Sequence, residues 1–198
     1  HVTGVQTCAL PICVIMPPKQ RITREMILER SFAMFCQEGM GAVNARSVAK
    51  ALNCSTQPIF SYFSGMDDLK NALDQKARDE FEQMAAQNAD KEHVLESCCT
   101  AYVRFASEQP RLFAHMFMDI NAGMTTFGNG LVREPIVEAE AAQSGLDKEK
   151  ARAVCEELWL FVHGMASMQA SGRTSYSKEQ EKSMISGVHE ALLAKAKN

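Results

Sequence analysis

The segment from residue 44 to residue 63, NARSVAKALNCSTQPIFSYF, constrains the fold more than any other part of the chain. Asn44 can cap a first helix, and Asn53 falls where the chain must turn, since Asn tolerates a left-handed backbone better than most residues. Ser55 can cap a second helix, with Pro58 in its first turn, where a missing backbone N–H leaves no hydrogen bond unmade. Two short helices joined by so tight a turn form a helix-turn-helix, so the pattern favours a DNA-binding protein.

Charge is distributed unevenly along the chain. The 198 residues carry a net charge of −3, but residues 1–63 contain six basic and three acidic side chains and so carry +3. The remaining residues therefore carry −6. A basic head on an acidic body is typical of a DNA-binding protein, although so few basic groups also fit an ordinary solvated surface.

The helix-turn-helix and its flanking helices share a set of positions, which are Ile27, Phe35, Gly39, Arg46, Val48, Ala49, Ser55, Ile59, Tyr62, Phe63 and Leu69. At this spacing, residues 22–73 resemble the amino-terminal domain of the TetR/AcrR family of transcriptional regulators. Three positions depart from the family pattern: Asn53 replaces a usual Gly, Phe60 a usual Tyr, and Met66 a Lys that generally touches phosphate. Loss of that ammonium group lowers the affinity for DNA without removing base-edge readout.

A second motif lies in the sequence LWLFVHGMASM, which contains Trp159, His163 and Gly164. With the proline, leucine and phenylalanine at positions 110–113, it makes residues 91–195 resemble the body domain called WHG, found in one branch of the TetR family. Trp159 and His163 are four positions apart, so their rings can pack together on one helix face. Gly164 costs about 1 kcal/mol relative to Ala inside a helix, so it needs a compensating reason such as close approach of another helix.

The resemblance implies a homodimer that binds a palindromic operator in double-stranded DNA. Helices expected from about Asp147 to Ala170 and from Ser177 to Ala196 would pair with their copies as a four-helix bundle. Gln57 is the first candidate for a base contact and Thr56 the second, because amide and hydroxyl side chains can read base edges. The candidates for phosphate contacts are Asn44, Arg46, Ser61, Tyr62 and Lys70.

Beyond residue 65, apolar residues recur at helical spacing. A connecting helix over about residues 67–87 is predicted by Leu69, Leu73, Ala77, Phe81 and Met84. Further helices are expected over about residues 94–106, 111–120, 131–144 and 147–170, and a last one from Ser177, whose Gln180 completes a capping box. No segment alternates with period two for long enough to form a strand, so we expect an all-α protein.

The expected organisation has two domains behind a short extension. Residues 16–66 form a three-helix, helix-turn-helix DNA-binding domain, and residues 67–198 a helical ligand-binding and dimerisation domain entered through the long helix. The first 15 residues, HVTGVQTCALPICVI, contain no Lys, Arg, Asp or Glu. They lack the basic start and long apolar core of a secretory signal and resemble a translated vector sequence. We expect a non-native or disordered extension ahead of a natural start at Met16.

An apolar set with a few polar groups in the body has the composition of a small-molecule site. Its members are Tyr102, Phe105, Phe113, Met116, Phe117, Trp159 and His163. The alternative is an ordinary core, because aromatic and Met residues at helical spacing are usually buried for packing. Twelve methionines favour an adaptable site for varied lipophilic compounds. In a repressor of this family, such an effector would tilt the connecting helix and release the operator.

Other classes of protein find less support. No nucleophile, carboxylate pair or set of metal ligands has the spacing that catalysis requires, so we expect neither an enzyme nor a bound cofactor or metal. No apolar run approaches the roughly 20 residues of a membrane helix. The alternative function is a dimeric small-molecule-binding protein with weak or lost DNA binding, for which Met66 is the main indication.

The seven cysteines form no CxxC pair. They therefore indicate reduced thiols in a cytoplasmic protein rather than disulfides. Adjacent Cys98 and Cys99 leave a redox role open, but neighbouring side chains on a helix point about 100° apart and bridge poorly.

Overall fold

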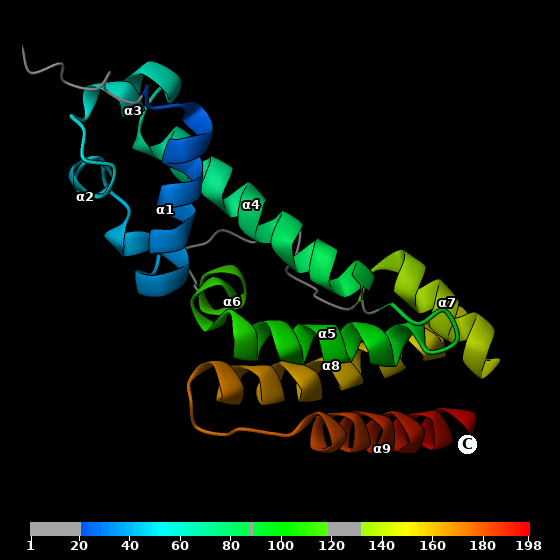
Figure 1. Ribbon diagram of the computed structural model, residues 1–198. Coiled ribbons are helices and arrows are strands. Elements are labelled where there is room, and N and C mark those ends of the chain that lie inside the picture. Colours follow the sequence, from blue (N-terminus) through cyan, green and yellow to red (C-terminus); the bar gives the residue numbers. More distant parts are fainter. Residues whose placement is uncertain (1–20, 88, 119–131) are drawn as a thin grey trace, which may run out of the picture.

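The computed structural model describes residues 21–87, 89–118 and 132–198. No strand occurs among these residues, so the expected all-α fold is confirmed (Figure 1). The proposed extension, residues 1–15, lies outside the described part. The helices are α1 (Arg24–Glu38), the short 3₁₀ helix η1 (Met40–Ala42), α2 (Ala45–Ala51), α3 (Gln57–Tyr62), α4 (Met66–Gln87), α5 (Val94–Glu108), α6 (Pro110–Phe117), α7 (Glu134–Ser144), α8 (Lys148–Ala170) and α9 (Lys178–Lys197).

The molecule consists of a small head and a larger body (Figure 1). Helices α1, α2 and α3 form the head, and α4 runs from the head to the body. In the body, α5 packs against α7, α8 and α9, while α6 contacts α1, α5 and α8. Helix α6 therefore lies where the head and the body meet.

The helix-turn-helix forms largely as its sequence indicates. Asn44 Oδ1 accepts a hydrogen bond from Ser47 N at 3.0 Å, and Ser47 Oγ accepts one from Asn44 N at 3.1 Å, so the predicted cap of α2 is confirmed. Asn53 makes the turn with a left-handed backbone, at a φ of 49°. The expected Ser55 cap is wrong: α3 begins at Gln57 without a side-chain cap, because the proline in its first turn already fixes a helical φ.

The apolar positions that carry the family resemblance form the core of the head. Buried side chains from α1, α2, α3 and α4 meet there, namely Ile27, Phe35, Val48, Ala49, Ile59, Phe63 and Leu69. The Arg24 guanidinium lies 4.9 Å from the centre of the Phe63 ring and covers one side of this core. Because Ile59 and Phe63 anchor one side of α3, the opposite side of this helix faces solvent.

The long connecting helix matches its predicted range within one residue. Its buried residues, Leu69, Leu73, Ala77 and Phe81, recur every four positions and form one stripe. This stripe packs on α1 near the head and on α5 near the body. A single rigid element therefore contacts both parts of the molecule.

The last two helices begin at strong caps. Asp147 accepts a hydrogen bond from Lys150 N at 2.9 Å at the start of α8. At the start of α9, Ser177 and Gln180 form the predicted capping box. Helix α6 ends at Phe117, earlier than expected, and residues 119 and 120 of its predicted range lie outside the described part.

Candidate nucleic-acid interface and ligand site

The solvent-facing side of α3 carries the candidate base contacts. Gln57, the first residue of this helix, is exposed, whereas Thr56 just before it is half-buried. Ser61, one turn further along, is exposed and its Oγ donates a hydrogen bond to Gln57 O at 3.0 Å. The Gln57 amide thus lies on an accessible helix surface, where an amide can reach base edges.

Sequence reasoning overlooked Phe60 as an outward residue. Its side chain is 52% exposed on α3, between the candidate DNA contacts Gln57 and Ser61. An exposed ring on this surface can contact a thymine methyl group or a sugar. The signal was available, because Phe60 follows buried Ile59 directly and successive helical positions point in different directions.

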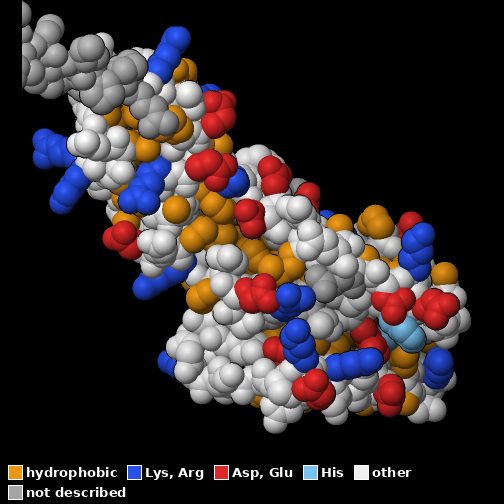
Figure 2. Space-filling model, viewed as in Figure 1, with side chains coloured by type: hydrophobic (Ala, Val, Ile, Leu, Met, Phe, Trp, Pro, Cys, Tyr) orange, Lys and Arg blue, Asp and Glu red, His pale blue; other side chains and the backbone are white. Residues whose placement is uncertain are grey.

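The candidate phosphate contacts surround α3, but several have partners within the chain. Asn44 is occupied by its cap, and the Tyr62 hydroxyl donates to Ile22 O at 3.2 Å. Arg46 and Lys70 form no ion pair among the described residues. Figure 2 shows Lys and Arg side chains projecting from the head on its side away from the body. Cationic groups without an acidic partner are best suited to bind phosphate.

Met66, which stands where the family generally has a phosphate-contacting Lys, is the first residue of α4. Its side chain is partly buried and packs against the hydrophobic core. It therefore contributes to the stability of the junction between α3 and α4 and supplies no charge to the DNA-facing surface.

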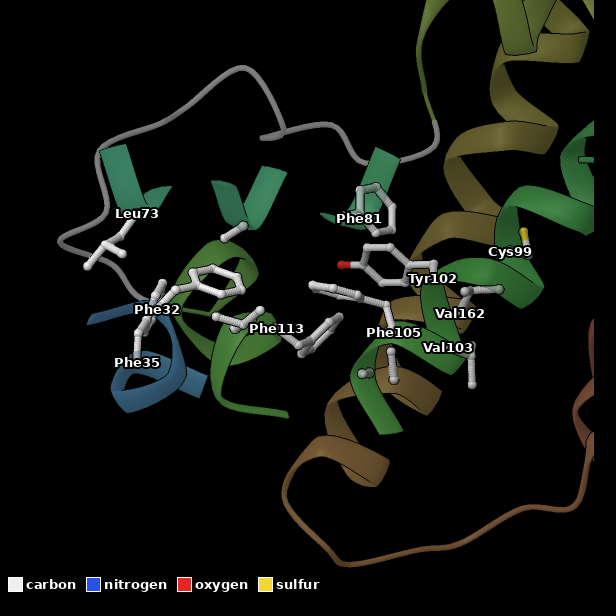
Figure 3. Packing of buried hydrophobic residues seen from close by; sticks show 14 of the residues in the cluster. Phe32, Phe35, Leu73, Phe81, Cys99, Tyr102, Val103, Phe105, Phe113 and Val162 are labelled. Atoms are coloured by element: carbon white, nitrogen blue, oxygen red, sulfur yellow. The ribbon is translucent and has the colours of Figure 1, made fainter. Parts of the chain in front are cut away.

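The body gathers the candidate ligand-site residues into one aromatic cluster. Figure 3 shows Phe81, Tyr102, Phe105 and Phe113 converging from α4, α5 and α6. The Tyr102 ring centre lies 5.2 Å from that of Phe113 and 4.9 Å from that of Phe117, both in edge-on arrangements. Such arrangements are favourable for aromatic pairs.

Helix α8 adds the polar part of the cluster. Trp159 and His163 stack with ring centres 5.3 Å apart, as their spacing predicts. The Tyr102 hydroxyl and His163 Nδ1 are hydrogen-bonded at 2.9 Å. Burial lowers the pKa of His163 and raises the pKa of Tyr102, so both side chains are neutral near pH 7.

The members of this cluster differ in accessibility. Tyr102, Phe105 and Phe113 are almost completely buried, whereas Met116 and Phe117 are only partly buried. The indole Nε1 of Trp159 is buried without a hydrogen-bond partner among the described residues. Trp159 also lines a hollow of about 180 Å³ with Val132, Glu156 and Leu160. The lining of this hollow is mixed, because Glu156 is charged and Val132 and Leu160 are apolar. A buried donor without a partner is a feature that a ligand with an acceptor group would complete.

A second buried group in the body escaped sequence reasoning. His189 in α9 contacts Glu96 of α5 through Nδ1 at 3.0 Å and Glu140 of α7 through Nε2 at 3.2 Å. Burial opposes the charged form of His189, but the two carboxylates outweigh it and hold its pKa above the ordinary value. The group joins three helices through charges rather than through apolar contacts.

The environments of the cysteine thiols in the body disfavour reactivity. Burial raises the pKa of both Cys98 and Cys99, and it raises the pKa of Cys155 to about 12. Because the thiolate is the reactive form, these environments disfavour redox chemistry. The described residues contain no group of three or more side chains that could hold a metal ion, and none of their helices is long and apolar enough to cross a membrane.

The chain is similar in structure to several solved transcriptional regulators. A TetR-like transcriptional regulator from Rhodococcus sp. RHA1 aligns at a TM-score of 0.66 and 14% identity, covering 88% of this chain and 99% of its own. The fatty acid degradation regulator FadR from Bacillus halodurans aligns at 0.58 and 15%, covering 85% and 93%. A putative TetR-family transcriptional regulator from Rhodococcus sp. aligns at 0.53 and 14%, covering 86% and 98%. At these identities the likeness shows a shared fold.

Sequence comparison identifies the domain in the body. No curated protein matches the chain. Residues 95–190 match the family model described as tetracyclin repressor-like, C-terminal domain. This range lies within the predicted body, residues 67–198, and close to residues 91–195, which carry the second resemblance. Residues 95–190 therefore form a tetracyclin repressor-like C-terminal domain, and the described chain has the fold of solved TetR-like transcriptional regulators.

Proposed function

We propose that this chain is a homodimeric DNA-binding regulator that represses transcription and leaves a palindromic operator when a small lipophilic molecule binds its body. The observation that carries the proposal is the exposed side of α3. There, Gln57 and Phe60 face solvent while Ile59 and Phe63 fix the helix to the head. A short, firmly anchored helix with an accessible amide at its start has the features of a recognition helix in the major groove.

A stripe on α8 supports dimerisation. Leu160 and Met168 are 64% and 43% exposed, and Gly164 lies midway between them at helical spacing. A Cβ atom on Gly164 would meet nothing within 4 Å among the described residues, so the expected close approach of another helix is not made by them. An exposed apolar stripe with a central glycine fits the close approach of a second copy.

The contacts of α6 support coupling between the body and the head. His115 Nε2 lies 2.8 Å from Asp74 Oδ1 of α4, and the His115 ring packs edge-on against Phe35 of α1 at 5.0 Å. Phe113 of the same helix belongs to the aromatic cluster (Figure 3). A ligand that displaces α6 would therefore change contacts to α1 and α4. It releases DNA only if it binds the released form more tightly than the DNA-bound form.

The apolar side chains of the aromatic cluster support a lipophilic effector. The solved relative from Bacillus halodurans is described as a fatty acid degradation regulator, and we propose the same broad class of apolar effector for this chain. Trp159 Nε1 would donate to an acceptor on that molecule. The test is to add laurate, a fatty acid anion, to a preformed complex of the protein with DNA. We expect laurate to release the DNA.

The DNA-binding proposal is tested by measuring the affinity of the purified protein for DNA from beside its own coding region. Gln57→Ala is compared with Gln83→Ala, which removes the same side chain from an exposed position on α4. Loss of a base contact should lower the specific affinity about tenfold or more for Gln57→Ala alone. Equal, sequence-independent binding by the parent and both variants would contradict the proposal. It would favour the alternative, a dimeric small-molecule-binding protein, which the packing of Met66 against the core also suits.

A further inference from the structure

A cavity of about 630 Å³ lies outside the aromatic cluster. It is bounded by α5 and the residues just before it, the end of α8, the loop between α8 and α9, and the first turns of α9. None of the residues predicted for the lipophilic site lines it. Its volume lies in the range of small-molecule sites. Helices α5 and α9 contact each other in the body. Figure 2 shows Lys, Arg, Asp and Glu side chains mingled over the visible face of the body.

The acidic side chains of the cavity are already engaged. Glu96 accepts hydrogen bonds from Ser186 Oγ at 2.8 Å and from His189. Glu108 pairs with Arg104 at 2.6 Å, and Asp90 accepts from a backbone N–H at 2.8 Å. Glu181 is buried and accepts from an amide of α8. These partners lower the capacity of the carboxylates to bind a cationic ligand.

Two lysines of the same cavity are not engaged in this way. Lys178 and Lys182 are exposed on α9, one helical turn apart, and both line the cavity. Neither forms an ion pair or a side-chain hydrogen bond among the described residues. Side chains at this spacing lie on one helix face, so both ammonium groups can reach the same anion.

Gln169 sets a second requirement for an occupant of the cavity, which is a hydrogen-bond donor. Its Nε2 donates to Glu181 Oε1 at 3.0 Å, which fixes the orientation of the amide. Its Oε1 is buried and has no hydrogen-bond partner in the described part of the chain. A buried acceptor without a donor is costly, so an occupant that brings an O–H or N–H group to this atom gains binding energy.

We infer that this cavity binds a small carboxylate that also carries a hydroxyl or amino group, with the carboxylate between Lys178 and Lys182 and the donor on Gln169 Oε1. The site is separate from the aromatic cluster, so the inference does not depend on the lipophilic effector proposed above. Its occupant would bridge α5, which belongs to the body core, and α9, which belongs to the proposed dimer bundle.

Three dicarboxylates of nearly equal size test this chemistry. Malate carries a hydroxyl group, aspartate an amino group, and succinate neither. Titration calorimetry on the full chain should show that malate or aspartate binds more tightly than succinate. Neutral dimethyl malate should not bind measurably. If succinate binds as tightly as both others, or if none of the three acids binds, the inference is wrong.

Two double variants test whether malate binds at Lys178 and Lys182. Lys178→Gln with Lys182→Gln should lower the affinity for malate by roughly tenfold or more, because a charged hydrogen-bond partner is lost. The matched control, Lys195→Gln with Lys197→Gln, removes the same charge from the other end of α9 and should leave the affinity unchanged. Equal losses in both double variants would indicate general electrostatic attraction and overturn the site.

Gln169→Met tests the donor position. In this variant the ratio of malate to succinate affinity should fall to about one, because the acceptor for the hydroxyl group is gone. This ratio compares two ligands on the same folded protein, so a general loss of stability leaves it unaltered. An unchanged ratio would show that the hydroxyl group is recognised elsewhere and would overturn the assignment of Gln169.

Discussion

The head and the body place their candidate functional side chains in opposite environments. In the head, Gln57 and Arg46 are exposed and rest on a core made by other residues. In the body, Tyr102, Phe105 and Phe113 belong to the candidate site and to the core at once. A surface site can therefore change without affecting stability, whereas a buried site cannot change without affecting the fold.

The largest effect should come from Phe113→Ala in the body. This side chain is fully buried and packs against the rings of Tyr102 and Phe117 at 5.2 Å each. Its removal leaves a cavity, and we expect the free energy of unfolding to fall by about 3–5 kcal/mol. Urea denaturation measures this loss.

The matching change in the head, Gln57→Ala, should alter the free energy of unfolding by no more than about 0.5 kcal/mol. If the two variants lose similar stability, the contrast between an exposed and a buried site does not hold.

His189→Gln should have the next largest effect, about 3 kcal/mol, because it leaves buried Glu140 without its partner. The loss should depend on pH. The raised pKa of His189 means that its contribution is complete below pH 6.5 and is lost as the pH rises through the raised value. Burial raises the pKa of Glu96, but hydrogen bonds from His189 and Ser186 outweigh it and lower the pKa, so its contribution is lost as the pH falls below 4.5.

The difference in unfolding free energy between the parent and His189→Gln should therefore be largest between pH 4.5 and pH 6.5. It should shrink at higher pH. Measurement of denaturation at several pH values checks this, with Lys197→Gln as a variant that should show no such profile. A difference that is constant with pH would mean that His189 acts through packing alone.

The head could be predicted more completely than the body because its signals are local. The Asn44 cap, the Asn53 turn and the apolar stripe of α4 each depend on residues within a few positions of one another. The pairing of Glu96 with His189 joins residues 93 positions apart, and no spacing rule connects them. The hydrogen bond from Gln169 to Glu181 likewise joins two different helices, and the unpartnered Oε1 atom of Gln169 has no signal in the sequence.

Local reasoning also has limits inside the head. Ser55 has the chemistry of a helix cap, but α3 begins two residues later, since several backbone conformations compete at a helix start. Phe60 was considered only as a departure from the family pattern, Phe in place of Tyr, although it is more than half exposed. In both cases the residue type was recognised and its surroundings were not.

A smaller effect should follow from Asn44→Ala in the head. The loss of a cap destabilises a helix by about 1 kcal/mol, and denaturation should show this decrease. Asn44→Asp separates the two roles suggested for this residue, because Asp keeps the cap and repels phosphate. Stability should then stay near that of the parent while the affinity for DNA falls. Unchanged affinity in Asn44→Asp would remove Asn44 from the phosphate contacts.

The smallest effect on stability, within about 0.5 kcal/mol, is expected for Arg46→Ala, which lies exposed at the start of α2. Its effect should appear in the salt dependence of DNA binding instead. Each phosphate contact contributes about 0.9 to the slope of log affinity against log salt concentration, so the slope should become shallower by that amount per subunit. Lys197→Ala, at the far end of the body, should leave the slope unchanged. An equal change in both variants would mean that overall charge rather than a defined contact of Arg46 governs binding, and the head would then lack the positioned phosphate contacts that a surface site requires.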